Sequence, residues 1–380
     1  MTPSPLSIPV VASESTPVKR AWLDQSDESL RAWFAERGEK PMRIRQVRQW
    51  LFQQRAESFA GMTDLPQKLR EQLDAEFTIF GSVIDRHMIA TDGTQKLVLR
   101  WQDGRRIECV MIPEGERRTA CISTQVGCAM GCVFCASGLN GVERNLTRGE
   151  ILEELIRIRN VTAPGERLTN VVVMGMGEPM ANLDNLLAAL DTAGRKDGLD
   201  LGARHVTIST VGLPVKMRRL AEHGKAYHLA VSLHAPNDEL RSQIVPTNQH
   251  TGIEPILAAA DAYFEQTGRQ VTYEYVVLGG INDQPIHATQ LANLLRGRKA
   301  YVNLIPFNAV EGLPYRDPKP RDLRHLIDTL RSAGVAVNIR KRKGADIDAA
   351  CGQLRRKVEA EAQANAAQAT ADARAALATN

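Results

Sequence analysis

The sequence lacks any long apolar run. No stretch approaches the roughly 18 apolar residues that a membrane-spanning helix requires, so we expect no membrane span. Residues 8–12 are apolar, but this run is too short for a signal peptide and no cation precedes it. Cysteine is also scarce, with 6 among 380 residues and no regular pairing. This predicts a reducing, cytoplasmic compartment and not a disulfide-bonded secreted fold.

Charge of one sign is not in large excess either. The formal net charge is +4, and 24% of the residues are charged, which is too little to establish nucleic-acid binding. The positive charge is nevertheless clustered. Residues 340–343 are all basic, and one predicted helix near the N-terminus carries Arg43, Arg45, Arg48 and Arg55. Such clusters are either solvated faces or phosphate-binding surfaces, and composition alone leaves both open.

Strand and helix signals alternate from about residue 119 onward, which predicts a parallel sheet. One of the helices opens on a capping box formed by Thr147 and Glu150. About six or seven such units are too few for a closed eight-fold barrel, so we expect an α/β fold. Its core would be a partial (β/α) barrel with the site at the carboxyl ends of the strands. The predicted strands are residues 120–123, 170–174, 205–209, 228–233, 271–278, 301–305 and 335–339.

The patterns before residue 119 are different. Residues 26–77 show the apolar periodicity of amphipathic helices. Residues 97–101 and 107–112 have the pattern of a β-hairpin whose turn is Asp103-Gly104. We therefore divide the chain into a disordered tail (1–22), an N-terminal helical domain (23–92), a β-hairpin linker (93–118), an α/β core (119–345), a C-terminal segment (346–357) and an Ala-rich tail (358–380).

Three cysteines carry the most information about chemistry. Cys128, Cys132 and Cys135 have the spacing C-x3-C-x2-C. Three thiolates can hold three irons of a [4Fe–4S] cubane, which leaves the fourth iron open to a small molecule. The alternatives are a structural zinc site or a buried apolar patch. Zinc prefers four ligands, usually in two C-x2-C pairs, and the sequence has no second pair.

Glycine and polar residues follow several of the predicted strands. Gly175-Met-Gly-Glu-Pro179 ends one strand, where glycines allow a ligand to approach the backbone. Ser209 lies at the end of another strand, and Ser232 and His234 at the end of a third. Each feature alone is usually structural, but residues at one rim of a barrel favour ligand contact.

The cysteine run, with an aromatic residue before its last cysteine, resembles the signature of the radical SAM superfamily. The turn at residues 175–179 is similar to that superfamily's GGEP motif, although Met176 departs from it, and Val211 replaces an expected serine. Further motifs narrow the resemblance to the RlmN family, radical SAM enzymes that methylate C2 of adenine in 23S rRNA and tRNA. The resemblance spans residues 26–357. Its motifs are Cys121-Ile-Ser-Thr-Gln-Val-Gly-Cys128, Arg144-Asn-Leu-Thr-Arg-Gly-Glu150, Ser232-Leu-His-Ala-Pro-Asn-Asp-Glu239 and Ala350-Cys351-Gly-Gln-Leu354.

The resemblance implies specific roles. Cys351 would carry the methyl group as S-methylcysteine, Cys121 would resolve it through a transient disulfide, and Glu108 would accept a proton. Residues 128, 132 and 135 would hold a [4Fe–4S] cluster. The SAM contacts it implies are Gly177, Glu178, Ser209, Ser232, Leu233, His234 and Asn308.

The mechanism that the resemblance implies consumes two SAM molecules in each turnover. One methylates Cys351, and the other yields the radical that activates the new methyl group. The implied partners are 23S rRNA and tRNA, contacted by the helical domain, and an electron donor such as flavodoxin or ferredoxin with its reductase. A monomer is expected.

The residues themselves leave alternatives open. Isolated cysteines are usually buried and inert, and only the resemblance pairs Cys121 with Cys351. The cations near Cys351 do favour a reactive thiolate, whereas Cys109 is expected to be structural. Two other functions remain: adenine-C8 methylation, as in the Cfr resistance enzymes, and a non-catalytic iron–sulfur or zinc RNA-binding protein.

Overall fold

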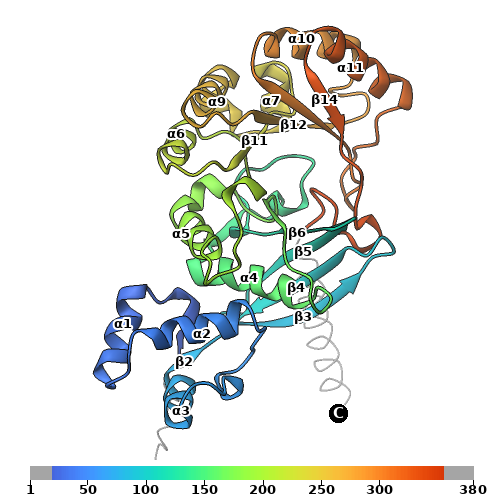
Figure 1. Ribbon diagram of the computed structural model, residues 1–380. Coiled ribbons are helices and arrows are strands. Elements are labelled where there is room, and N and C mark those ends of the chain that lie inside the picture. The colour runs from blue at the N-terminus through green and yellow to red at the C-terminus, as the bar shows by residue number, and fades with distance from the viewer. Residues whose placement is uncertain (1–18, 355–380) are drawn as a thin grey trace, which may run out of the picture.

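The computed structural model describes residues 19–354, and a ten-stranded sheet forms its centre (Figure 1). The strand order is β14-β13-β12-β11-β10-β9-β6-β5-β4-β3. From β6 to β14 all neighbouring strands are parallel, which confirms the predicted α/β core. The parallel strands are β6 (Arg117–Cys121), β9 (Asn170–Val173), β10 (Val206–Thr210), β11 (His228–Ser232), β12 (Val271–Val277), β13 (Ala300–Pro306) and β14 (Ala336–Ile339).

Helices connect the parallel strands and pack on the outer face of the sheet (Figure 1). The capping box predicted at Thr147 and Glu150 is present at the start of α4. Proline occupies the first turn of α6, α10 and α11, where no backbone N–H is needed. The helices of the core are α4 (Arg148–Asn160), α5 (Leu183–Ala193), α6 (Pro214–Glu222), α7 (Asp238–Ile244), α8 (Asn248–Thr251), α9 (Ile253–Thr267), α10 (Pro285–Leu295) and α11 (Pro320–Ser332).

The two faces of the parallel sheet differ in polarity. Side chains alternate along a strand, so Ile208 is fully buried in the hydrophobic core while Ser209 lines an inner cavity. The register places Ser232, Glu274 and Asn303 side by side on three neighbouring strands. A row of polar side chains therefore crosses the inner face of the sheet.

The N-terminal region has three α-helices within the predicted helical range 26–77: α1 (Asp27–Glu36), α2 (Met42–Phe52) and α3 (Gln67–Glu76). Its core is aromatic: Trp22 and Trp33 both pack edge-on against Phe77, with ring centroids 5.3 and 5.2 Å apart. Within residues 19–354, no helix is both long and apolar enough to cross a membrane.

Three predicted segments before the core need correction. Residues 1–22 are not tail throughout, because β1 (Arg20–Ala21) pairs with β2 (Phe77–Thr78). Residues 23–92 are not helical throughout, because β3 (Ser82–Ile89) is the edge strand of the central sheet. Residues 93–118 are not a linker, because β4 (Gln95–Trp101) and β5 (Arg106–Glu114) continue that sheet into β6. The sequence of β3 did not show a clear strand pattern, because an edge strand exposes most of its side chains and can carry charged residues. Residues 1–18 and 355–380 lie outside the described part of the chain.

The arginines of the N-terminal region prove to have different surroundings. Arg48 is only 5% exposed and bridges Asp27 of α1 to Asp197 of the core. Arg43 pairs with Glu39 at 3.1 Å. Arg55 donates hydrogen bonds to carbonyl groups of the loop after α4, among them Thr162 O at 2.8 Å. Arg45 is exposed. Two of the four arginines, Arg48 and Arg55, therefore join the N-terminal region to the core, and Arg55 lies beyond the end of α2 and not on the predicted helix.

Replacing Arg48 by methionine should therefore destabilise the protein, because it leaves the half-buried carboxylates of Asp27 and Asp197 with Arg195 as their remaining cation. We expect Arg48→Met to lower the free energy of unfolding by about 2 kcal/mol, measured by urea denaturation. Arg45→Met on the same helix should change it by less than about 0.5 kcal/mol. Equal effects of the two substitutions would contradict the assigned contacts.

The same ion pair predicts a pH dependence. Arg48 holds the pKa of Asp27 well below its usual value of 3.8. Because the folded-state pKa is the lower one, this stabilisation is fully present above pH 3.8 and is lost as the pH falls below it. The difference in unfolding free energy between wild type and Arg48→Met should shrink accordingly in acid.

Candidate active site

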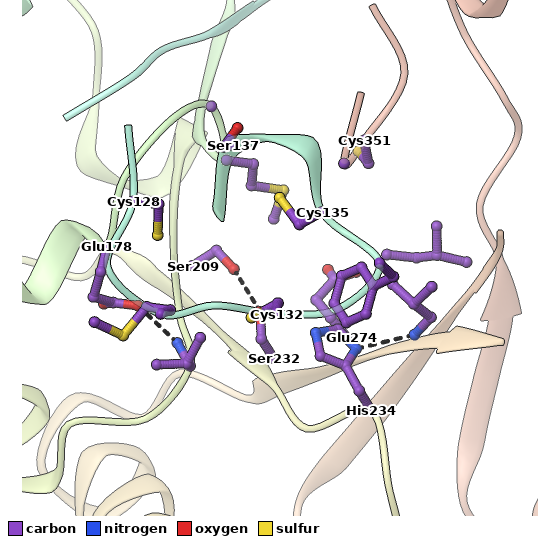
Figure 2. A pocket seen from close by; sticks show the side chains of 18 of the residues that line it. Cys128, Cys132, Cys135, Ser137, Glu178, Ser209, Ser232, His234, Glu274 and Cys351 are labelled. Atoms are coloured by element: carbon purple, nitrogen blue, oxygen red, sulfur yellow. Dashed lines mark hydrogen bonds between the residues drawn. The ribbon is translucent and has the colours of Figure 1, made fainter. Parts of the chain in front are cut away.

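The three cysteines lie on one loop between β7 (Gln125–Gly127) and the short helix η3 (Ala136–Gly138) (Figure 2). The backbone of this loop is anchored at both ends. Cys128 N donates to Gly141 O at 2.9 Å, and Val133 N donates to Ile244 O at 3.1 Å. Gly127 has φ +78°, and a Cβ there would lie 2.1 Å from Gly141 O, so only glycine fits.

This loop forms one wall of a cavity whose other walls are strand ends. The cavity is lined by all three cysteines and by six of the seven predicted SAM contacts: Gly177, Glu178, Ser209, Ser232, His234 and Asn308. Leu233 is the exception, since its side chain is fully buried in the hydrophobic core. Its backbone N–H donates to Glu274 O at 3.0 Å. The carboxyl ends of the parallel strands thus meet at one site, as expected for a barrel.

Glu178 is held by backbone amides. Its Oε1 accepts from Met180 N and its Oε2 accepts from Val211 N, both at 2.9 Å. Burial raises the pKa of Glu178, and the hydrogen bond from Val211 opposes that rise. A carboxylate oxygen accepts more than one hydrogen bond, so Glu178 can still bind an ammonium group. Gly177 has φ +101°, and a Cβ there would lie 2.6 Å from Gln125 Cβ.

His234 supports the cysteine loop. Its Nδ1 accepts a hydrogen bond from Val276 N at 3.0 Å. Burial, with a contribution from Arg241, lowers the pKa of His234 to about 3, so the ring is neutral at physiological pH. The ring of Phe134 packs edge-on against it with centroids 4.7 Å apart. The aromatic residue before Cys135 therefore fixes the loop to the sheet.

Beyond β14 the chain returns toward β5 and β6 (Figure 1), and we call residues 344–354 the return segment. Cys351 lies on it and lines the same cavity as the three cysteines (Figure 2). Asn308 Nδ2 donates to Cys351 O at 2.9 Å, and Ala136 N donates to Gly352 O at 2.8 Å. The cysteine loop therefore contacts the return segment directly.

The other end of the return segment is held by the turn between β3 and β4. Gly344 N donates to Asp92 Oδ2 at 3.1 Å, and Thr91 N donates to Asp346 Oδ2 at 2.9 Å. A Cβ on Gly344 would lie 2.8 Å from Thr94 Cγ2, so the two turns are in close contact.

Glu108 is connected to the return segment through Lys96. Glu108 Oε1 lies 3.3 Å from Lys96 Nζ, and each side chain is 5% exposed. The same Nζ donates to Asp348 O at 2.9 Å. One buried ammonium group therefore joins the predicted proton acceptor to the backbone three residues before Cys351.

Cys121 is buried near Cys351. Burial first, and then the charge of Cys351, raise the pKa of Cys121 to about 12, while Arg340 opposes the rise. The two residues are thus within electrostatic reach, although all six cysteines of the chain are free thiols here. Cys109 is fully buried, and burial raises its pKa strongly, in agreement with a structural residue.

The chain matches two family models. Residues 122–291 match the Radical SAM superfamily, and residues 22–79 match the ribosomal RNA large subunit methyltransferase N-terminal domain. A probable dual-specificity RNA methyltransferase RlmN of Rhodopirellula baltica is 55% identical over 92% of this chain and 96% of its own. One of Thermosynechococcus vestitus is 45% identical over 88% of this chain and 97% of its own.

A solved structure agrees with these relatives. The crystal structure of a radical SAM methyltransferase from Sphaerobacter thermophilus has a TM-score of 0.86 and 40% identity, over 88% of this chain and 99% of that one. The chain belongs to the RlmN family. It is therefore a radical SAM methyltransferase, and its superfamily implies a [4Fe–4S] cluster and SAM.

The residues that line the cavity fit both the [4Fe–4S] cluster and SAM. In residues 19–354 no three His, Cys, Asp or Glu side chains are close enough to share a single metal ion. Cys128, Cys132 and Cys135 line one cavity, and in a three-cysteine cluster site each thiolate binds a different iron. Asn308 Oδ1 is buried without a hydrogen-bond partner. A donor group of a bound ligand would satisfy it.

Three residues of the site were not predicted individually from the sequence of this RlmN-family chain. Glu274 interrupts the largely apolar run of residues 271–278, and that interruption was an available signal, whereas Lys96 lies just before the predicted strand 97–101 and gave none. Arg340 belongs to a basic cluster in sequence, but in the structure it lines the cavity beside Cys351 and donates to Met174 Sδ at 3.3 Å. Sequence could not separate it from its exposed basic neighbours.

Replacing any one of the three cysteines of the cysteine loop should abolish cluster binding, because three ligands leave no spare. After anaerobic reconstitution, Cys128→Ala, Cys132→Ala and Cys135→Ala should each lose the iron–sulfur absorbance and SAM cleavage. Cys109→Ala, which removes a buried thiol outside the cavity, should retain the iron of wild type. Full iron content and turnover in any of the first three variants would refute the ligand assignment.

Proposed function

We propose that this protein methylates C2 of adenine in 23S rRNA and in tRNA, at the adenosine 3′ of the anticodon. The names of the relatives, which describe dual-specificity RNA methyltransferases, support an RNA substrate. The observation that carries the proposal is the placement of Cys351 in the wall of the cavity that holds the three cysteines, with Cys121 nearby.

The chemistry explains why such a cysteine is needed. C2 of adenine is an electrophilic aromatic carbon without a lone pair, so SAM cannot methylate it by direct displacement. When bound, the cluster supplies an electron that cleaves SAM and gives a 5′-deoxyadenosyl radical. The protein's task is to present the group that this radical activates and to exclude water around it.

Cys351 is the residue that presents this group. Its thiolate takes a methyl group from one SAM molecule, and a second SAM molecule is used to activate that methyl group, so each turnover consumes two. The hydrogen bond from Asn308 to Cys351 O holds the residue at the cavity wall. Gly177, Glu178, Ser209, Ser232, Leu233 and His234 contribute to the SAM site.

Glu108 and Cys121 complete the reaction. Glu108, whose carboxylate pairs with Lys96 at 3.3 Å, accepts the C2 proton. Once the adduct between the Cys351 methylene carbon and adenine C2 has lost its C2 proton and returned one electron to the cluster, Cys121 attacks the sulfur of Cys351. The disulfide forms as the sulfur–methylene bond breaks, and the methylene carbon takes a proton to become the methyl group of the released base. An external thiol reductant then restores both cysteines, and flavodoxin or ferredoxin with its reductase supplies the cluster's electron. The protein works as a monomer, and the N-terminal helices contribute to RNA binding.

Two alternative functions predict different outcomes of an activity assay. Adenine-C8 methylation requires the same cluster and both cysteines, and a non-catalytic RNA-binding protein requires neither cysteine. Mass spectrometry of nucleosides from RNA incubated with reconstituted protein, SAM and reductant separates the three. We expect 2-methyladenosine. The C8 isomer would establish the first alternative, and SAM-independent RNA binding without any methylated nucleoside would establish the second.

The two working cysteines should fail differently when replaced. Cys351→Ala removes the carrier, so it should accept no methyl group and form no RNA adduct. Cys121→Ala still loads Cys351 and should accumulate a covalent protein–RNA species through Cys351, visible on a denaturing gel as a slow band that ribonuclease removes. Cys109→Ala is the matched control and should give neither defect. A folded, methylated, cluster-loaded Cys121→Ala protein without adduct would exclude the resolving role.

A further inference from the structure

A second cavity adjoins the first at Cys351 and is not lined by the three cysteines of the cysteine loop. The two cavities share six lining residues: Met174, Glu274, Ile305, Asn308, Arg340 and Cys351. Cys351 therefore stands where the two cavities meet. Apart from these shared residues, the inner wall of the second cavity is rich in hydroxyl and amide groups from four strands, Thr119, Thr207, Thr272, Tyr301 and Asn303.

This position matters if Cys351 carries a methyl group, so the inference rests on the proposed function. A carrier needs the source of its activation on one side and the acceptor on the other. The first cavity contains the three cysteines and Glu178. The second cavity is then the place for the acceptor base. Arg117, Lys341 and Lys343 also line it, and their charges suit the phosphates of RNA.

A buried carboxylate faces this second cavity. Glu274 is 4% exposed and pairs in register with Asn303 of β13. Asn303 Nδ2 lies 3.2 and 3.1 Å from the two carboxylate oxygens. Each oxygen keeps capacity to accept another hydrogen bond, and the Asn303 amide has a second N–H to donate. Burial raises the pKa of Glu274, and Arg340 opposes that shift.

We propose that the second cavity receives the target adenine, extruded from the RNA, and that Glu274 and Asn303 recognise its Watson–Crick edge. Glu274 accepts a hydrogen bond from the 6-amino group, and Asn303 donates one to N1. Enzymes that modify a base commonly extrude it and recognise this edge. C2 is bonded to N1, whereas C8 lies at the far end of the purine. Recognition of this edge therefore brings C2, and not C8, toward Cys351.

The test compares two RNA hairpins that are identical except at the unpaired target position. One carries adenosine and the other purine riboside, which lacks the 6-amino group. Dissociation constants are measured by fluorescence anisotropy with cluster-reconstituted wild type, Glu274→Leu and Glu265→Leu. Wild type should bind the adenosine hairpin about tenfold more tightly. Glu274→Leu should bind the two hairpins within about twofold of each other. Glu265→Leu, the same substitution at an exposed position of α9 outside both cavities, should keep the wild-type ratio.

Iron content and thermal melting show whether Glu274→Leu has folded. If it has not, Asn303→Ala, at a half-buried position, replaces it and should also reduce the ratio. A wild-type ratio near one, or an unchanged ratio in a folded variant, would overturn the assignment of this edge. Failure of wild type to form 2-methyladenosine would instead refute the proposed function. Product formed without preference for the 6-amino group would refute only this inference.

Discussion

The site depends on the way the return segment is held between two distant parts of the chain. The turn between β3 and β4 binds one end through Gly344 and Asp346, and the cysteine loop binds the other through Gly352. Cys351 lies between these anchors, in the cavity wall. Lys96 adds a buried charge that ties the same segment to Glu108. One anchor is the turn at the β3 edge of the sheet, and the return segment itself follows β14 at the opposite edge, so both edges must be in position before Cys351 is placed.

The parallel sheet supplies the rest of the site through its alternation of side chains. Apolar residues such as Ile208 pack in the core, so their neighbours in sequence must face inward. The register then aligns Ser232, Glu274 and Asn303 across three strands. One row of polar groups thereby serves both cavities. The division of labour that we propose, with activation on one side of Cys351 and base recognition on the other, follows from that row.

Sequence predicted the parts of this architecture that have a local signal. The alternation of strands and helices, the capping box at Thr147 and the spacing of the cysteines are all visible within short windows. Contacts across the sheet are not. Arg48 was grouped with surface cations because its carboxylate partners are Asp27 and the distant Asp197. The charges of β3 concealed a strand at the sheet edge, where burial is low. The polar wall of the second cavity depends on register, which single strands do not reveal.

The central claim is that Cys351, at the junction of the two cavities, passes its own methyl carbon to the base. A single-turnover labelling experiment tests it directly. Protein methylated on Cys351 with ¹³C-methyl SAM is freed of small molecules, then given unlabelled SAM, reductant and RNA. The account predicts that the first 2-methyladenosine formed contains the ¹³C carbon. An unlabelled methyl group in that first product, with the label still on the protein, would contradict it.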